Sequence, residues 1–217
     1  MIGTSGHLVL LSVFLVAISA CGKPAPAQRQ PETPVAQIAR QEKARVAMDE
    51  AAQIASLIDP AKLATLKERG ANGRVQKITA ILATAKAAGK SPQEITQQAV
   101  RKIGWGESPK GELTTAAILR NLDIAEKLGA TTPEDITAMR KGNAATVRRG
   151  QYTGDILSVD HVIPRSVAPE LDNCIANLEL MPLRLNQSKG DSIGDRQRSL
   201  ARKLHAAGLR ENPELPD

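Results

Sequence analysis

The scarcity of aromatic side chains constrains the fold of this chain more than any other feature of its sequence. Among 217 residues there are one Phe, one Trp and one Tyr, at Phe14, Trp105 and Tyr152. A packed core must therefore be aliphatic, and the many Ala, Leu and Ile residues favour helices. Hydrophobic residues make up 41% of the chain, which excludes a wholly disordered protein. The few rings also argue against an aromatic platform for stacking single-stranded bases.

Helical patterns dominate the chain up to about residue 140. Apolar residues recur at helical spacing between residues 35 and 58, which predicts one long helix there. Asp59-Pro60 and Ser91-Pro92 each combine an N-cap residue with Pro at the first helical position. Further helices are expected over residues 60–69, 74–88, 92–102 and 112–128 and from Thr132, with a loop over 104–111 and no strand before about residue 150. The sequence therefore predicts a mainly α chain with a small α+β part near its C-terminal end.

The helical region, residues 35–140, has no assigned role in this interpretation. Residues 21–140 hold 18 Lys and Arg residues and 13 Asp and Glu residues, and the rest of the chain is nearly neutral. A phosphate-binding surface is one interpretation of this excess. Solvated helical faces are the favoured one, because acidic and basic side chains alternate closely. Trp105 is expected to be a partly buried anchor between helices.

The N-terminal residues have the pattern of an export signal. The apolar run over residues 8–17 is too short to span a bilayer and is typical of a signal-peptide core. It is followed by Ile18-Ser19-Ala20-Cys21, which resembles the lipobox of bacterial lipoproteins, where cleavage before the cysteine is followed by lipidation. The resemblance implies a signal peptide over 1–20 and a membrane anchor on Cys21. The alternatives are an ordinary signal peptide and a hydrophobic start that was wrongly assigned to the chain.

Two further expectations follow from this N-terminal pattern. Gly22 follows the lipidated position, which by the same resemblance favours anchoring in the outer membrane of the cell envelope. Residues 21–34 contain four prolines and are expected to form an extended tether between the membrane and a folded part.

The residues with the clearest chemistry lie after Gly150. A strand is expected over residues 156–159 and ends at Asp160-His161, and after a loop of about a dozen residues a second strand with period-two alternation is expected from Asn177 to Leu180. A helix over 182–189, with Gly190 near its end, carries Asn186. Two strands and a helix in this order would bring Asp160, His161, Asn177 and Asn186 together.

These side chains suit metal-assisted hydrolysis of a phosphodiester. The Asp160 carboxylate and the Asn186 amide offer the hard oxygen ligands that Mg²⁺ or Mn²⁺ prefers. A neutral His161 can take a proton from water, because the imidazole titrates near neutral pH. A divalent cation would bind the scissile phosphate and offset charge on the leaving oxygen.

The segment resembles the HNH endonuclease motif, a ββα-metal finger. The matching residues are Tyr152-Thr153-Gly154, Asp160-His161-x-x-Pro164, Asn177-Leu178 and Asn186-x-x-Lys189-Gly190, with 16 residues from His161 to Asn177 and 9 more to Asn186. The resemblance implies that His161 is the general base, that Asn177 on the second strand orients it, and that Asp160 and Asn186 hold the metal. Asn stands where the strict motif has its last His, so zinc or nickel is not implied. Arg165 and Lys189 are candidate nucleic-acid-binding residues, and solvated positions are the alternative for both.

The sequence thus predicts a helical region at 35–140 and an HNH nuclease domain at 141–217. The expected activity is hydrolysis of nucleic acid, with DNA favoured and RNA left open, using one divalent cation, Mg²⁺ first and Mn²⁺ as the alternative. The competing hypothesis is a non-catalytic envelope lipoprotein in which the helices and the finger form a binding scaffold. Two cysteines exclude a paired-cysteine zinc knuckle. Cys174 is expected to be a small buried side chain, and His205 is assigned no role.

Overall fold

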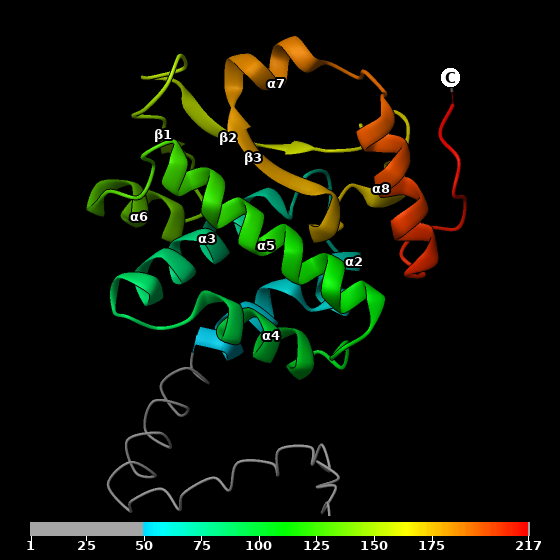
Figure 1. Cartoon of the computed structure of the whole chain (residues 1–217), viewed down its shortest axis with the longest axis horizontal. Coiled ribbons are helices and arrows are strands. Elements are labelled where there is room, and N and C mark those ends of the chain that lie inside the picture. Colours follow the sequence, from blue (N-terminus) through cyan, green and yellow to red (C-terminus); the bar gives the residue numbers. More distant parts are fainter. Residues whose placement is uncertain (1–49, 217) are drawn as a thin grey trace, which may run out of the picture.

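The computed structural model describes residues 50–216 (Figure 1). The predicted signal peptide, Cys21, the Pro-rich tether and the first part of the helix expected over residues 35–58 lie outside the described residues. No helix within residues 50–216 is both long enough and apolar enough to cross a membrane.

Helices make up most of this part of the chain, which confirms the predicted mainly α class. Four of the helices before residue 141 carry Pro in their first turn, where its missing N–H costs no hydrogen bond. The helices are residues 50–58, α2 (Pro60–Ala64), α3 (Asn72–Ala87), α4 (Pro92–Lys102), α5 (Pro109–Lys127), α6 (Pro133–Arg140), α7 (Leu183–Lys189) and α8 (Asp195–Ala206).

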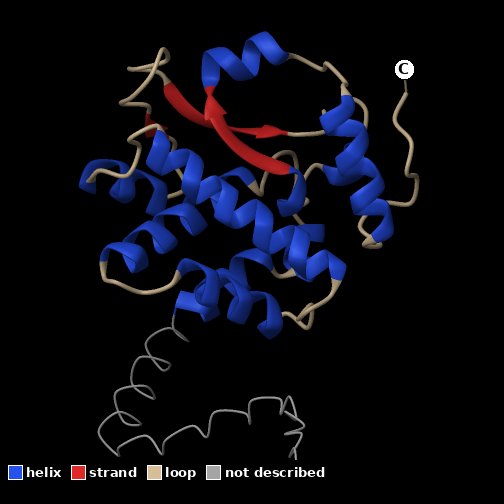
Figure 2. Ribbon diagram, in the orientation of Figure 1, coloured by secondary structure: helices blue, strands red, loops and turns tan. Residues whose placement is uncertain are grey.

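The strands form one small antiparallel sheet in the order β1-β2-β3, shown in red in Figure 2. They are β1 (Ala145–Thr146), β2 (Ile156–His161) and β3 (Leu178–Pro182). In the β2–β3 pair, Asp160 lies opposite Glu179 and His161 opposite Leu178. Two short 3-10 helices, η1 (Pro169–Leu171) and η2 (Ile175–Asn177), lie between β2 and β3. Helix α7 follows β3 directly and covers one face of the sheet, while α3 and α5 lie on the other side (Figure 1).

Two helix boundaries differ from the prediction by three residues or more. The helix expected over residues 60–69 ends at Ala64, because the following segment is held by side chains from residues 172 and 173 instead of by helical bonds. Helix α5 begins at Pro109, not at residue 112, because the Ser108 hydroxyl accepts a hydrogen bond from the backbone N–H of Gly111 and caps the first turn.

The sheet also differs from the prediction in three respects. A strand does occur before residue 150: β1 is only two residues long, too short to show alternation, and its Thr146 N–H donates to the Asp135 carboxylate at 3.1 Å. Asn177 is the last residue of η2 and precedes the second strand, and the loop expected there contains two 3-10 turns. The alternation expected in the second strand is wrong, because every residue of β3 is buried between helices on both faces.

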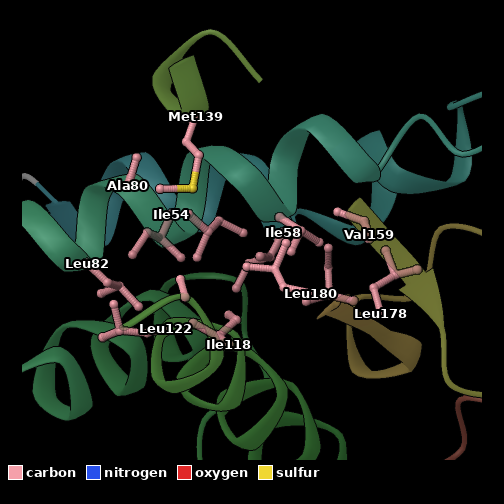
Figure 3. Packing of buried hydrophobic residues seen from close by; sticks show 14 of the residues in the cluster. Ile54, Ile58, Ala80, Leu82, Ile118, Leu122, Met139, Val159, Leu178 and Leu180 are labelled. Atoms are coloured by element: carbon pink, nitrogen blue, oxygen red, sulfur yellow. The ribbon is translucent and has the colours of Figure 1, made fainter. Parts of the chain in front are cut away.

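The main core is aliphatic and joins the helical region to the sheet. Figure 3 shows Ile58, Ile118 of α5 and Leu180 of β3 converging in it. Trp105 and Tyr152 pack against this cluster and stay partly buried, as expected for Trp105. A second cluster packs α8 over the segment between β2 and β3 and includes Ile163, Leu171 and Leu204. The sheet is therefore stabilised by burial against helices from both ends of the described chain.

Helix α5 also provides hydrogen-bond partners for the backbone of β3 along the edge that no other strand covers. Asn121 is 2% exposed, and its side-chain amide donates to the Leu178 carbonyl at 3.1 Å and accepts from the Leu180 N–H at 2.8 Å. An unpaired backbone group at this buried edge would lose its water without gaining a partner. One side chain therefore substitutes for a neighbouring strand.

We expect Asn121→Ala to lower the free energy of unfolding by about 1–3 kcal/mol, because the buried Leu180 N–H loses its partner, while the Leu178 carbonyl keeps a hydrogen bond from Arg120 at 3.3 Å. Urea denaturation followed by circular dichroism measures the change. Asn143→Ala, at an exposed position, is the matched control and should change stability little. Equal effects of the two substitutions would contradict the role of Asn121 at the strand edge.

Candidate functional site

Most of the predicted site residues line one cavity of about 780 Å³. It lies where the end of β2, helix α7 and the segment after β2 meet. Five of the seven predicted site residues line it: Asp160, His161, Arg165, Asn186 and Lys189. Asn177 lies behind the cavity wall, and Cys21 is outside the described residues. The fold therefore brings together side chains that are up to 29 positions apart in sequence.

Asp160 is held by an ion pair from α7. The Lys189 ammonium lies 2.6 Å from Asp160 Oδ2 and donates a second hydrogen bond to the His161 carbonyl at 2.7 Å. Both side chains are largely buried, 12% exposed for Asp160 and 16% for Lys189. The end of α7 that carries Lys189 is closed by Gly190, whose φ of +55° favours glycine. Lys189, predicted to contact nucleic acid, is thus paired with a carboxylate of the same protein.

The ring of His161 is held on one side only. Its Nε2 lies 2.9 Å from the backbone carbonyl oxygen of Asp172 and 3.1 Å from the Oδ1 of the same residue. A carbonyl oxygen can only accept, so Nε2 carries the proton of the neutral ring. This leaves Nδ1 as the nitrogen with an available lone pair. His161 is therefore arranged as a proton acceptor whose tautomer is set by Asp172.

Asp172 was not singled out from the sequence. It lies in the segment after η1, and its Oδ2 accepts a hydrogen bond from the backbone N–H of Arg69 at 3.0 Å. Arg165 Nη1 lies 4.0 Å from the same oxygen. Nothing in the sequence separates Asp172 from the nearby Glu170, because the bond to His161 depends on the path of a loop with no periodic pattern.

Asn177 fixes the backbone that follows His161. It is fully buried, accepts from the Ile163 N–H at 2.8 Å through Oδ1 and donates to the Ile163 carbonyl at 3.0 Å through Nδ2. Its own carbonyl accepts from the Val162 N–H at 2.8 Å. Asn177 touches no group of the cavity and acts through the backbone, so it is a positioning residue.

Helix α7 is oriented by two contacts with β2 and the segment before it. The Asn186 amide donates to the Ser158 hydroxyl at 3.3 Å through Nδ2, which leaves its oxygen unused by that bond. The Asp155 carboxylate accepts from the Arg184 N–H at 2.9 Å, and this hydrogen bond holds the pKa of Asp155 below its usual value. Arg184 also lies over the Tyr152 ring, 5.7 Å from its centre. The Tyr152-Thr153-Gly154 run therefore adjoins the helix that carries Asn186.

A second carboxylate, Glu179, faces the same side of the sheet as Asp160. It is 3% exposed and forms a two-point ion pair with Arg196 of α8, 2.8 Å from Nη1 to Oε1. Arg120 Nε lies 3.6 Å from Glu179, and burial lowers the pKa of Arg120 while Glu179 partly offsets that effect. The hydrogen bond with Glu179 raises the pKa of Arg196, and the nearby Asp160 adds to it. The register of β2 and β3 creates this pair of carboxylates.

Two other residues considered in the sequence analysis, Cys174 and His205, do not line the cavity. Cys174 is a free, half-buried thiol, and burial raises its pKa. His205 is exposed on α8 and bonds only locally, to the carbonyl of Arg210 at 3.2 Å.

The donors for a metal are few. Residues 50–216 contain no group of three or more His, Cys, Asp and Glu side chains that could hold a metal ion. The cavity does offer the Asp160 carboxylate and the Asn186 amide oxygen. Two hard oxygens with water and phosphate are a donor set that fits Mg²⁺, which is commonly held by one or two carboxylates plus substrate. The Lys189 ammonium at Asp160 Oδ2 is the cation that such an ion would face.

Comparison of the chain with protein-family models, with curated proteins and with solved structures gave no match.

We expect Asn177→Ala to lower the free energy of unfolding by about 2–5 kcal/mol, because both Ile163 backbone groups lose a buried partner. The imidazole signals of His161 in proton NMR should move as well, because the backbone next to the ring is released. Asn143→Ala, at an exposed position, is the control. Unchanged His161 signals in Asn177→Ala would contradict the positioning role.

Proposed function

We propose that this chain is a metal-dependent endonuclease of the HNH type that hydrolyses phosphodiester bonds in nucleic acid, with DNA as the favoured substrate. The observation that carries the proposal is the convergence of Asp160, His161 and Asn186 on one cavity. These residues come from β2 and α7, and the order β2-β3-α7 agrees with a ββα finger. The residue types match those that phosphodiester hydrolysis needs.

In this proposal His161 is the general base. The Asp172 carbonyl fixes the proton on Nε2, so that Nδ1 accepts the proton of the attacking water. The imidazolium formed in that step faces the Asp172 carboxylate at 3.1 Å, which offsets its new charge. Asn177 keeps residues 162 and 163 in place and thereby restricts the direction of the ring.

Asp160 and Asn186 would hold the divalent cation. Mg²⁺ is favoured over Zn²⁺, because the donors are a carboxylate and an amide oxygen with no thiolate or second imidazole. When bound, the ion would supply charge stabilisation of the phosphate and of the leaving oxygen. The Lys189 ammonium neutralises Asp160 in the structure, so binding of the cation requires that Lys189 share or leave that carboxylate.

The competing proposal is a non-catalytic envelope lipoprotein that uses the same parts as a binding scaffold. The Lys189–Asp160 ion pair is the observation that favours it, because it satisfies the candidate metal ligand from within the protein. Metal-dependent cleavage separates the two proposals.

We expect the full chain, purified in mild detergent, to nick supercoiled plasmid in the presence of Mg²⁺ or Mn²⁺ and to lose this activity in EDTA. His161→Ala should lower the rate by about 100-fold or more, the range typical for loss of a general base. His205→Ala is the matched control, because this second histidine is exposed on α8 and should leave the rate unchanged. Gel separation of nicked and supercoiled plasmid measures the rates.

Two outcomes would count against the nuclease. Equal nicking by His161→Ala and the unchanged chain would exclude His161 as the base. A folded chain that cleaves none of plasmid, single-stranded DNA and RNA would favour the binding lipoprotein. Cleavage of RNA alone would keep the chemistry and change the substrate.

We further propose that lipid on Cys21 anchors the protein in the bacterial cell envelope, with the outer membrane favoured. A nuclease in that place would spare the chromosome and meet incoming or environmental DNA. The support is the order of apolar core, small residues and cysteine in the sequence.

The anchor is tested by growing a bacterial host that expresses the chain with a labelled fatty acid. We expect the purified protein to carry the label and Cys21→Ala to lose it. Cys174→Ala is the matched control and should keep the label, because this thiol lies half-buried within the fold. An unlabelled cytoplasmic protein with an uncut N-terminus would overturn the proposal.

A further inference from the structure

The helical region contributes a residue to the cavity. The segment Leu66–Ala71, here called the strap, connects α2 to α3 and lies against residues 172 and 173. Three hydrogen bonds hold it: the Arg69 N–H donates to Asp172 Oδ2 at 3.0 Å, the Ala71 N–H donates to Asn173 Oδ1 at 2.9 Å, and Asn173 Nδ2 donates to the Leu66 carbonyl at 3.2 Å. Through these bonds Arg69 reaches the cavity wall, more than 90 positions before His161 in the sequence.

The backbone of the strap is held in an uncommon conformation. Arg69 has a backbone φ of +50° and Glu68 has a φ of +20°, values that residues other than glycine rarely adopt. A Cβ atom at Gly70 would lie 2.8 Å from the Lys67 carbonyl oxygen, so the turn is tight. Such strain persists only where surrounding contacts impose it, and it concentrates at functional sites. Here the bond from Arg69 to Asp172 is one of those contacts.

The basic side chains that line the cavity differ in whether a carboxylate lies next to them. Lys189 is paired with Asp160 at 2.6 Å, and Arg165 lies 4.0 Å from Asp172. The side chain of Arg69 is exposed and makes no ion pair or hydrogen bond with any residue between 50 and 216. Arg69 is thus the cavity cation whose charge the described part of the chain leaves uncompensated.

We propose that Arg69 binds a backbone phosphate of the nucleic acid that enters this cavity. The inference rests on the proposed nuclease function and extends it, because it makes the helical region part of the substrate-binding surface. A guanidinium matches a phosphate with two parallel hydrogen bonds. A phosphate contact of this kind strengthens binding to every sequence alike and carries no base preference.

The strap also links substrate contact to the base. Asp172 accepts from the Arg69 N–H through Oδ2 and faces His161 through its carbonyl and Oδ1. The backbone of Arg69 is therefore held next to the residue that sets the His161 tautomer. Asp172 thus contacts both the strap backbone and the proposed proton acceptor.

The test measures binding of a fluorescent duplex DNA to the full chain by anisotropy, in EDTA and at several salt concentrations. Arg69→Gly removes the guanidinium and accommodates the positive φ, so the strap should stay folded. We expect Arg69→Gly to weaken binding by about fivefold to tenfold at low salt and to reduce the slope of log K against log salt by about 0.9, the value of one phosphate contact. Arg69→Asn should give the same loss, because Asn also tolerates this backbone region.

The matched control is Arg101→Ala, which removes the same charge from an exposed position of α4 that lines a different hollow. Its affinity should stay within about twofold of the unchanged chain and its salt slope nearly the same. If Arg69→Gly and Arg101→Ala behave alike while the unchanged chain nicks plasmid, the role of Arg69 is overturned and the nuclease stands. If the unchanged chain neither binds nor cleaves nucleic acid, the proposed function fails, and this inference fails with it.

Discussion

The hydrogen bonds of Asp172 connect the two halves of the described chain at the cavity. Its carboxylate accepts from the strap of the helical region, and its carbonyl sets the proton of the His161 ring. Asn173 adds two bonds to the same strap. Because the strap backbone adopts positive φ at Glu68 and Arg69, these contacts must outweigh an unfavourable local conformation. The position of His161 therefore depends on residues about 100 positions earlier in the chain.

The small sheet depends on helices in a similar way. A two-stranded hairpin is at best marginally stable alone, and β1 adds only two residues to the pair of β2 and β3. The main core supplies the missing burial on one face, and α7 covers the other. Asn121 then satisfies the outer edge of β3 where a fourth strand would otherwise pair. The helices act as the support that keeps β2 and β3 in register, and that register sets Asp160 opposite Glu179.

The two carboxylates that lie opposite each other on β2 and β3 each have a basic partner. Lys189 compensates Asp160, and Arg196 compensates Glu179. Buried carboxylates need such partners, because an unpaired charge out of water is costly. The pairing explains why Lys189, a candidate phosphate ligand by its place in the motif, is occupied within the protein, whereas Arg69 from the helical region is exposed and without a described partner. An anionic ligand in the cavity would therefore provide the negative charge that Arg69 lacks among the described residues.

The sequence by itself determined the helical class, the aliphatic core, and the order of two strands and a helix around Asp160, His161 and Asn186. These features follow from local rules, such as Pro after an N-cap residue, Gly190 at a helix end, and apolar spacing. The tertiary structure alone decided the end of α2 at Ala64, the burial of both faces of β3, and the contacts of Asp172, Glu179 and Arg69. Each of these depends on chain segments that are distant in sequence, and no local periodicity encodes which of several similar carboxylates or arginines will meet across a fold.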